Sequence, residues 1–228
     1  MNIKYHTKTE HYLSIDDLTF EIPFSNPIAE HTIMEKTTDG YVLGILYQDT
    51  DYEPNRMFTD EDGNGKILSF HRHVGTAMHE EAYRAMGRYA NLEDPDERIP
   101  AAPIFRLLSC YSHSGESWGL VGEVQQCNFD TAQIAGVWVP DKCAEENIEI
   151  RTAGLSEDGK KLAIDAYVRN VIDTYNSYLS GEVYGICFAH YDLGRNLVDE
   201  VSCWGYVGWK GTIAEMKSQL ESYCANQK

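Results

Sequence analysis

A long amphipathic segment at residues 160–179 sets the first limit on the fold of this chain. Its apolar residues recur at intervals of three and four, so they lie along one face of a helix. These residues are Ile164, Tyr167, Val168, Val171, Ile172, Tyr175, Tyr178 and Leu179. Gly181 is suited to ending the helix, because glycine readily adopts the left-handed backbone conformation found at such ends. A helix with so broad an apolar face requires a second layer of structure to cover it.

Short strand-like segments make up most of the remaining chain. They are rich in β-branched and aromatic residues, and they are predicted at 18–24, 41–47, 66–71, 104–111, 118–124, 133–139, 182–190 and 197–207. Short connections favour antiparallel pairing, most clearly in a hairpin of 182–190 with 197–207. Further helices are predicted at 76–90 and 141–147, and a last helix is predicted to open with a capping box at 212–215.

Runs of strands separated by a few helices indicate an α+β fold rather than a repeated βαβ pattern. We therefore expect a mainly antiparallel sheet with the long amphipathic helix and a C-terminal helix packed on it. The long helix is expected to cover the sheet that contains 182–190 and 197–207.

The length of 228 residues and the hydrophobic content of 43% fit one elaborated domain, 1–228. No apolar run is long enough to span a membrane, and the first ten residues lack the apolar stretch of an export signal. Six cysteines, at positions 110, 127, 143, 187, 203 and 224, show no close pairing, so we expect reduced and mostly buried thiols. These features predict a soluble cytoplasmic protein.

The chain is strongly acidic, with 36 aspartate and glutamate residues against 19 lysine and arginine residues and a formal net charge of −17. Such a charge repels nucleic acids and anionic membranes and attracts basic protein surfaces. It therefore predicts no direct nucleic-acid partner and no membrane. The charge serves either solubility or a functional surface, for which the candidates are Asp49, Asp51, Glu53, Asp60, Glu61, Asp62, Glu93, Asp94, Asp96 and Glu97.

Part of a calcium-binding loop is present near residue 60. Asp60, Asp62, Asn64 and Gly65 match positions of an EF-hand loop, where oxygen atoms surround Ca²⁺ at a sharp glycine turn. The twelfth position, normally a bidentate glutamate, is His71, and a strand rather than a helix is predicted to follow. An acidic hairpin turn accounts for the same residues, so no metal is assigned. A calcium-stabilised interaction module stays open as an alternative.

Residue types suited to binding or catalysis gather in the middle of the sequence. His71 and His73 share one face of a predicted strand, and Cys110 lies three residues before His113. Neither group completes a four-ligand metal set or a nucleophile elbow, so no cofactor and no catalytic residue are assigned. An enzyme or small-ligand-binding protein stays open as an alternative, with a pocket formed by His71, His73, Tyr111, His113, Asp130 and Gln133.

Segments between residues 66 and 210 resemble a family of uncharacterised proteins from phage genomes and mobile elements. Residues 70–73 and 111–115 resemble its Phe-His-Arg-Arg and Tyr-Asp-His-Ser-Gly segments. Residues 129–138 resemble its Trp-Asp-Ser-Gly-Gln-Val-Gly-Phe-Ile-Tyr segment, with Ala132 and Ala135 in place of the two glycines. The similarity is strongest at 175–185 and 202–208, and residues 1–60 carry none.

This resemblance implies a phage or mobile-element origin and no particular reaction. Residues 175–181 are also similar to the Tyr-Asn-x-Gly segment of ArdA-type antirestriction proteins, which are acidic DNA mimics. Charge and resemblance together favour a binding function over an enzyme. We expect a viral anti-defence protein of the bacterial host cytoplasm that inhibits a host defence or nucleic-acid-handling component with a basic surface. Its carboxylates would imitate the phosphates of DNA. A homo-oligomer is compatible with the sequence.

Overall fold

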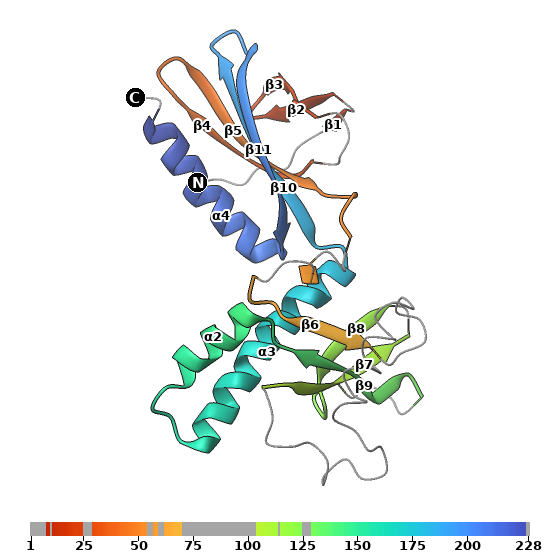
Figure 1. The fold of residues 1–228 in the computed structure, drawn as a ribbon. Coiled ribbons are helices and arrows are strands. Elements are labelled where there is room, and N and C mark those ends of the chain that lie inside the picture. The colour runs from red at the N-terminus through yellow and green to blue at the C-terminus, as the bar shows by residue number, and fades with distance from the viewer. Residues whose placement is uncertain are drawn as a thin grey trace. The chain divides into compact units, whose positions relative to one another are not determined.

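The structure, a computed structural model, describes residues 8–9, 11–24, 29–53, 57–58, 62–69, 104–113, 115–124 and 129–226. The chain divides into two compact units (Figure 1). The first unit consists of Met1–Tyr52 together with Gly181–Lys228, and the second is Glu53–Ser180. The first unit is discontinuous because strands near the end of the chain pair with strands near its start.

The first unit is built around an antiparallel sheet in the order β11-β10-β5-β4. Its strands are β4 Ala29–Lys36, β5 Gly40–Gln48, β10 Val183–Asp192 and β11 Leu197–Val207. A smaller sheet packs on one face and helix α4, Trp209–Asn226, packs on the other (Figure 1). The smaller sheet consists of β1 Lys8–Thr9, β2 Tyr12–Ile15 and β3 Leu18–Glu21.

Apolar side chains on both faces of the central strands hold this unit together. Successive residues of a strand point to opposite faces, so β5 supplies two cores at once. Leu43 and Ile45 pack with Phe20 of the small sheet, and Leu46 packs with Met216 of α4. Burying one such side chain completely contributes roughly 1.5–3 kcal/mol. The run of apolar residues in β5 is therefore explained by burial on both sides.

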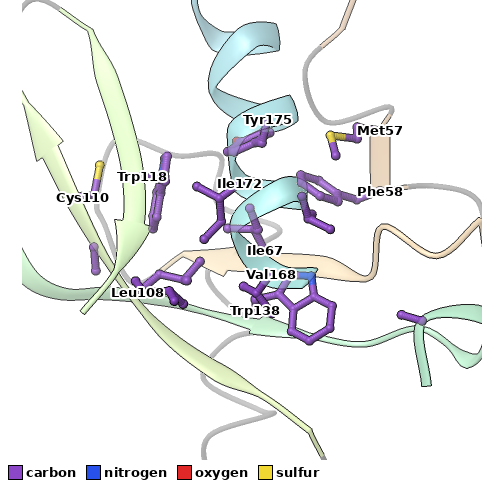
Figure 2. Close-up of a cluster of buried hydrophobic side chains, with 14 of the residues drawn as sticks. Met57, Phe58, Ile67, Leu108, Cys110, Trp118, Trp138, Val168, Ile172 and Tyr175 are labelled. Atoms are coloured by element: carbon purple, nitrogen blue, oxygen red, sulfur yellow. The ribbon is translucent and has the colours of Figure 1, made fainter. Parts of the chain in front are cut away.

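The described part of the second unit contains an antiparallel sheet in the order β6-β9-β7-β8 and two helices. Its strands are β6 Lys66–Ser69, β7 Arg106–Ser112, β8 Glu116–Leu120 and β9 Thr131–Val139, and its helices are α2 Lys142–Thr152 and α3 Glu157–Leu179. Figure 2 shows the core, in which Val168, Ile172 and Tyr175 of α3 meet Trp118 and Trp138 of the sheet.

Helix α3 also covers part of the outer edge of this sheet. The side-chain amide of Asn176 accepts a hydrogen bond from the backbone N–H of Trp118 at 2.8 Å. It also donates one to the Trp118 carbonyl oxygen at 2.9 Å. An additional strand would pair with the same two backbone groups. A helix side chain therefore takes the place of a neighbouring strand at β8.

Several predictions about the elements are confirmed. The fold is α+β, the strands pair antiparallel, β10 and β11 form a hairpin, and α4 packs on its sheet through Met216 and Leu220. The partner predicted for the long helix is wrong. Its apolar face packs on the sheet of the second unit, whereas β10 and β11 belong to the first unit. Adjacency in sequence suggested the wrong sheet.

Two further differences concern segments near the ends of the chain. The capping box at 212–215 is wrong, because α4 already begins at Trp209 and the Thr212 hydroxyl donates to the Gly208 carbonyl oxygen at 2.8 Å. Strand β4 was not predicted at all. The helix predicted at 76–90 lies outside the residues that the structure describes.

Candidate functional site

An aspartate–histidine pair lies where β7 ends and β9 begins. His113 follows β7, and Asp130 directly precedes β9. The Ser112 backbone N–H donates to the Asp130 carbonyl oxygen at 2.8 Å, which holds the two strand ends together. His113 Nδ1 lies 3.2 Å from Asp130 Oδ2, and the Tyr111 ring stacks beside the imidazole with centroids 6.5 Å apart. The fold therefore brings together three members of the pocket predicted from sequence.

This pair is open to solvent. The side chain of His113 is 66% exposed and that of Asp130 is 33% exposed. Gln133 lies exposed on β9, while His71 and His73 lie outside the described residues. A carboxylate next to an imidazole can fix the tautomer of the ring and assist proton transfer, but covalent catalysis also requires a nucleophile within reach.

Cys110 does not supply that nucleophile. Its side chain is fully buried on the core face of β7, opposite Trp118 of β8. Burial raises the pKa of the Cys110 thiol to about 12, with a smaller contribution from the Glu116 carboxylate. The thiol is therefore protonated at neutral pH, and only the thiolate is strongly nucleophilic. The two residues noted in the sequence, Cys110 and His113, are thus a buried thiol and an exposed imidazole.

The partial calcium loop is held by a carboxylate of the protein. Asp141 Oδ2 accepts hydrogen bonds from the backbone N–H groups of Gly63 at 3.1 Å and Gly65 at 2.8 Å. Its other oxygen accepts from the Ala144 N–H and so begins α2. Asp62 in turn accepts from the backbone and side chain of Asn64. The turn leads into strand β6, as predicted.

Carbonyl oxygens of this turn are also occupied. The Trp138 indole N–H donates to the Asn64 carbonyl oxygen at 2.8 Å, and the Tyr167 hydroxyl donates to the Gly63 carbonyl oxygen at 2.6 Å. Within the described ranges, no group of three histidine, cysteine, aspartate or glutamate side chains is placed to hold a metal ion. Asp60 lies outside those ranges. The segment is thus a turn held by hydrogen bonds, and the strand that follows it, β6, pairs with β9 rather than with a strand before the turn as a hairpin would require.

The acidic candidates are only partly described. Asp51, Glu53 and Asp62 are exposed, and Asp49 is half-buried with its carboxylate accepting from the Asp51 backbone N–H at 3.0 Å. The remaining candidates lie outside the described residues and are Asp60, Glu61, Glu93, Asp94, Asp96 and Glu97. The described candidates all lie in loops between strands.

A more rigid set of carboxylates lies on helix α2. Glu145, Glu146 and Glu149 are exposed on this helix, and within the described part of the chain none of them has an ion-pair partner. Residues three or four apart on a helix are neighbours, with Cβ atoms about 5–6 Å apart. The sequence predicted a helix here, and the acidic residues on its exposed face were the available signal.

Two other exposed carboxylates of the second unit are paired locally. Glu123 binds the Arg169 guanidinium through both of its oxygens, and Glu157 binds Lys160 at 2.8 Å. The three exposed glutamates of α2 are here named the α2 carboxylates, and Lys142 is exposed on the same helix.

Comparison with known protein families, curated proteins and solved structures finds no match to this chain. Among the described helices, none is both long and apolar enough to cross a membrane. The class of the protein is therefore defined by its own geometry, as an α+β chain of two compact units with an acidic surface.

Proposed function

We propose that this chain is a phage-encoded accessory protein that binds and inhibits a basic host component through its acidic surface. The host component is a defence or nucleic-acid-handling protein, and the carboxylates stand in for the phosphates of its normal ligand. The proposal concerns binding, so it requires no cofactor and no covalent step.

The observation that carries the proposal is the α2 carboxylates, three exposed glutamates fixed on a packed helix. A rigid helix keeps charges at constant spacing, so little conformational entropy is lost when a partner binds. Buried residues of α2, Ala144 and Ile148, anchor the helix in the second unit. A net charge of −17 adds a long-range attraction for a basic partner and increases the rate of encounter.

The test uses the purified full chain as bait in bacterial lysate. We expect capture of a basic protein in a fixed ratio, and the captured amount should fall as salt rises. Exposed charges are screened over about 10 Å at 0.1 M ionic strength. Replacing Glu145, Glu146 and Glu149 together with lysine should abolish capture, and replacing them with glutamine should weaken it partly. This gradation separates loss of charge from a change of shape.

The aspartate–histidine pair supports a second candidate function, an enzyme or ligand-binding protein that acts at His113. The supporting observation is the 3.2 Å contact with Asp130. A variant carrying His113→Ala and Asp130→Asn distinguishes the two candidates. If inhibition of the host component survives the lysine replacements on α2 and disappears in this variant, the acidic-surface proposal is wrong.

A further inference from the structure

Strand β11 presents a long exposed edge. It lies at the end of the sheet of the first unit, and within the described part of the chain it pairs with β10 alone. Nine consecutive residues, from Leu197 to Gly205, are exposed. Val198 is 60% exposed and Val201 is 49% exposed. An unpaired edge offers backbone N–H and C=O groups to a further strand, and proteins usually cover or interrupt such edges.

The part of the β11 edge that pairs without irregularity is about as long as a typical β-strand. The pairing of β11 with β10 is interrupted at two irregularities, between Tyr184 and Gly185 and between His190 and Tyr191. Between them, the segment 199–204 pairs without a break. A strand of about five or six residues is typical of globular proteins. The β11 edge thus differs from that of β8, where the Asn176 side chain occupies the backbone groups of Trp118.

A groove runs beside this edge, on the side of the sheet that faces α4. It has a volume of about 470 Å³, and Ile186 and Phe188 of β10 form part of its lining. Val201 and Cys203 border it on β11, and Gln219 borders it on α4. Apolar side chains of an added strand would find a surface here that α4 leaves open.

The charge of this region identifies the partner. β11 carries Asp199 and Glu200, and the wall of the groove on α4 carries Glu215. Neither β11 nor the described lining of the groove contains a lysine or arginine. A second copy of this chain would bring the same acidic edge, whereas a basic segment complements it.

We propose that the β11 edge and its groove bind an extended, basic segment of the partner protein by strand addition. Backbone hydrogen bonds to 199–204 supply affinity, and alternate apolar side chains enter the groove. The lysine or arginine side chains between them lie on the opposite face of the sheet, beside Glu200. This inference rests on the proposed function, because it names how a basic partner is held.

The probe is an acetylated peptide of alternating lysine and valine, about eight residues long. Titrating it into the isotopically labelled full chain should shift backbone amide resonances of 199–204 and of the groove, and affinity should fall with salt. N-methylation of alternate peptide amides on the edge-facing side should weaken binding by about tenfold or more, because several backbone hydrogen bonds are lost. This control leaves the protein unchanged.

Protein variants complete the test. Asp199→Lys with Glu200→Lys should abolish peptide binding, whereas Asp158→Lys with Asp173→Lys, at exposed positions of α3, should leave it unchanged. The proposal is overturned if the N-methylated peptide binds equally well, if the shifted resonances lie elsewhere, or if the chain dimerises through β11.

The two proposals fail in different ways. If the host partner is captured equally by the chain with and without the β11 lysine pair, strand addition is wrong and the acidic-surface function stands. If the peptide binds at β11 as expected but no basic host protein is captured, the proposed function is wrong and the strand-addition site stands.

Discussion

Tyr175 and Trp204 are both aromatic but differ sharply in burial. Tyr175 is 2% exposed in the core of the second unit, whereas Trp204 is 39% exposed. Trp204 nevertheless covers Gly185, where an added Cβ atom would overlap the indole ring. It also stacks with Tyr47 at a centroid distance of 6.2 Å. A glycine is thus required at position 185 by the close approach of the Trp204 ring.

Replacing these two aromatic residues should have unequal effects. Tyr175→Ala should lower the free energy of unfolding by about 3–5 kcal/mol, because it empties a buried site. Trp204→Ala should lower it by about 1–2 kcal/mol, because much of the ring is already in water. Urea denaturation of each variant measures both values, and Tyr175→Phe serves as the control for volume. Equal losses of stability in the two variants would contradict the difference in burial between Tyr175 and Trp204.

Two cysteines should be protected from alkylation in the folded chain. Burial raises the pKa of the Cys110 and Cys187 thiols to about 12, from an ordinary value of 9.0. At pH 8 we expect iodoacetamide to modify the exposed Cys203 and to spare these two until the chain unfolds. Mass spectrometry of the digested protein identifies the modified sites. Rapid labelling of Cys110 without denaturant would contradict its buried position.

The same two thiols predict the direction of the alkaline dependence of stability. Because the folded pKa exceeds the unfolded one, the folded state retains protons that the unfolded state loses. The contribution of these two protonated thiols to the free energy of unfolding is complete below pH 9, and it is lost as the pH rises toward 12. The prediction of buried thiols from sequence is confirmed for this pair, whereas Cys143 and Cys224 are half-buried.

The contact between α3 and β8 depends on one side chain. Asn176→Ala should lower the free energy of unfolding by about 1–3 kcal/mol, because it leaves two backbone groups of Trp118 without their partner. Asn170→Ala, at an exposed position of the same helix, is the matched control and should have little effect. Chemical denaturation compares the two, and equal stabilities would show that water replaces the Asn176 amide without cost.

Local sequence patterns predicted most of the helices and strands. They failed where contacts between segments far apart in the sequence determine the structure. The apolar run of β5 and the apolar stripe of α3 can be recognised in the sequence because the spacing of their apolar residues matches the faces that become buried. β4 is only half-buried, so its mixed residues give no clear alternation. The aspartate–histidine pair was predicted as a neighbourhood, but its exposure depends on how β7 and β9 end. Asp141 holds Gly63 and Gly65 although it lies far from them in the sequence, so no local sequence pattern predicts this role.

The division into two units was not predictable from composition, because both units combine an antiparallel sheet with packed helices. The first unit should fold without the second. Among the residues that the structure describes, its cores draw on its own two segments, and the Asp49 backbone N–H donates to the Val183 carbonyl oxygen at 2.9 Å. We expect a chain in which a short glycine–serine linker replaces 53–180 to unfold cooperatively in urea. Circular dichroism measures this, and a gradual, non-cooperative loss of signal would contradict it.

The insertion of the second unit between β5 and β10 fixes an order of events during synthesis. β5 leaves the ribosome long before its partner β10, since Tyr47 pairs with Gly185. At about 5–20 residues per second, the wait lasts on the order of ten seconds. Throughout that time β5 lacks the backbone partner β10, and Leu46 lacks Met216 of α4, while the contiguous second unit emerges whole. The segment that is translated first is therefore the last to reach its native structure, and nascent chains stalled before β10 should be the form that chaperones bind.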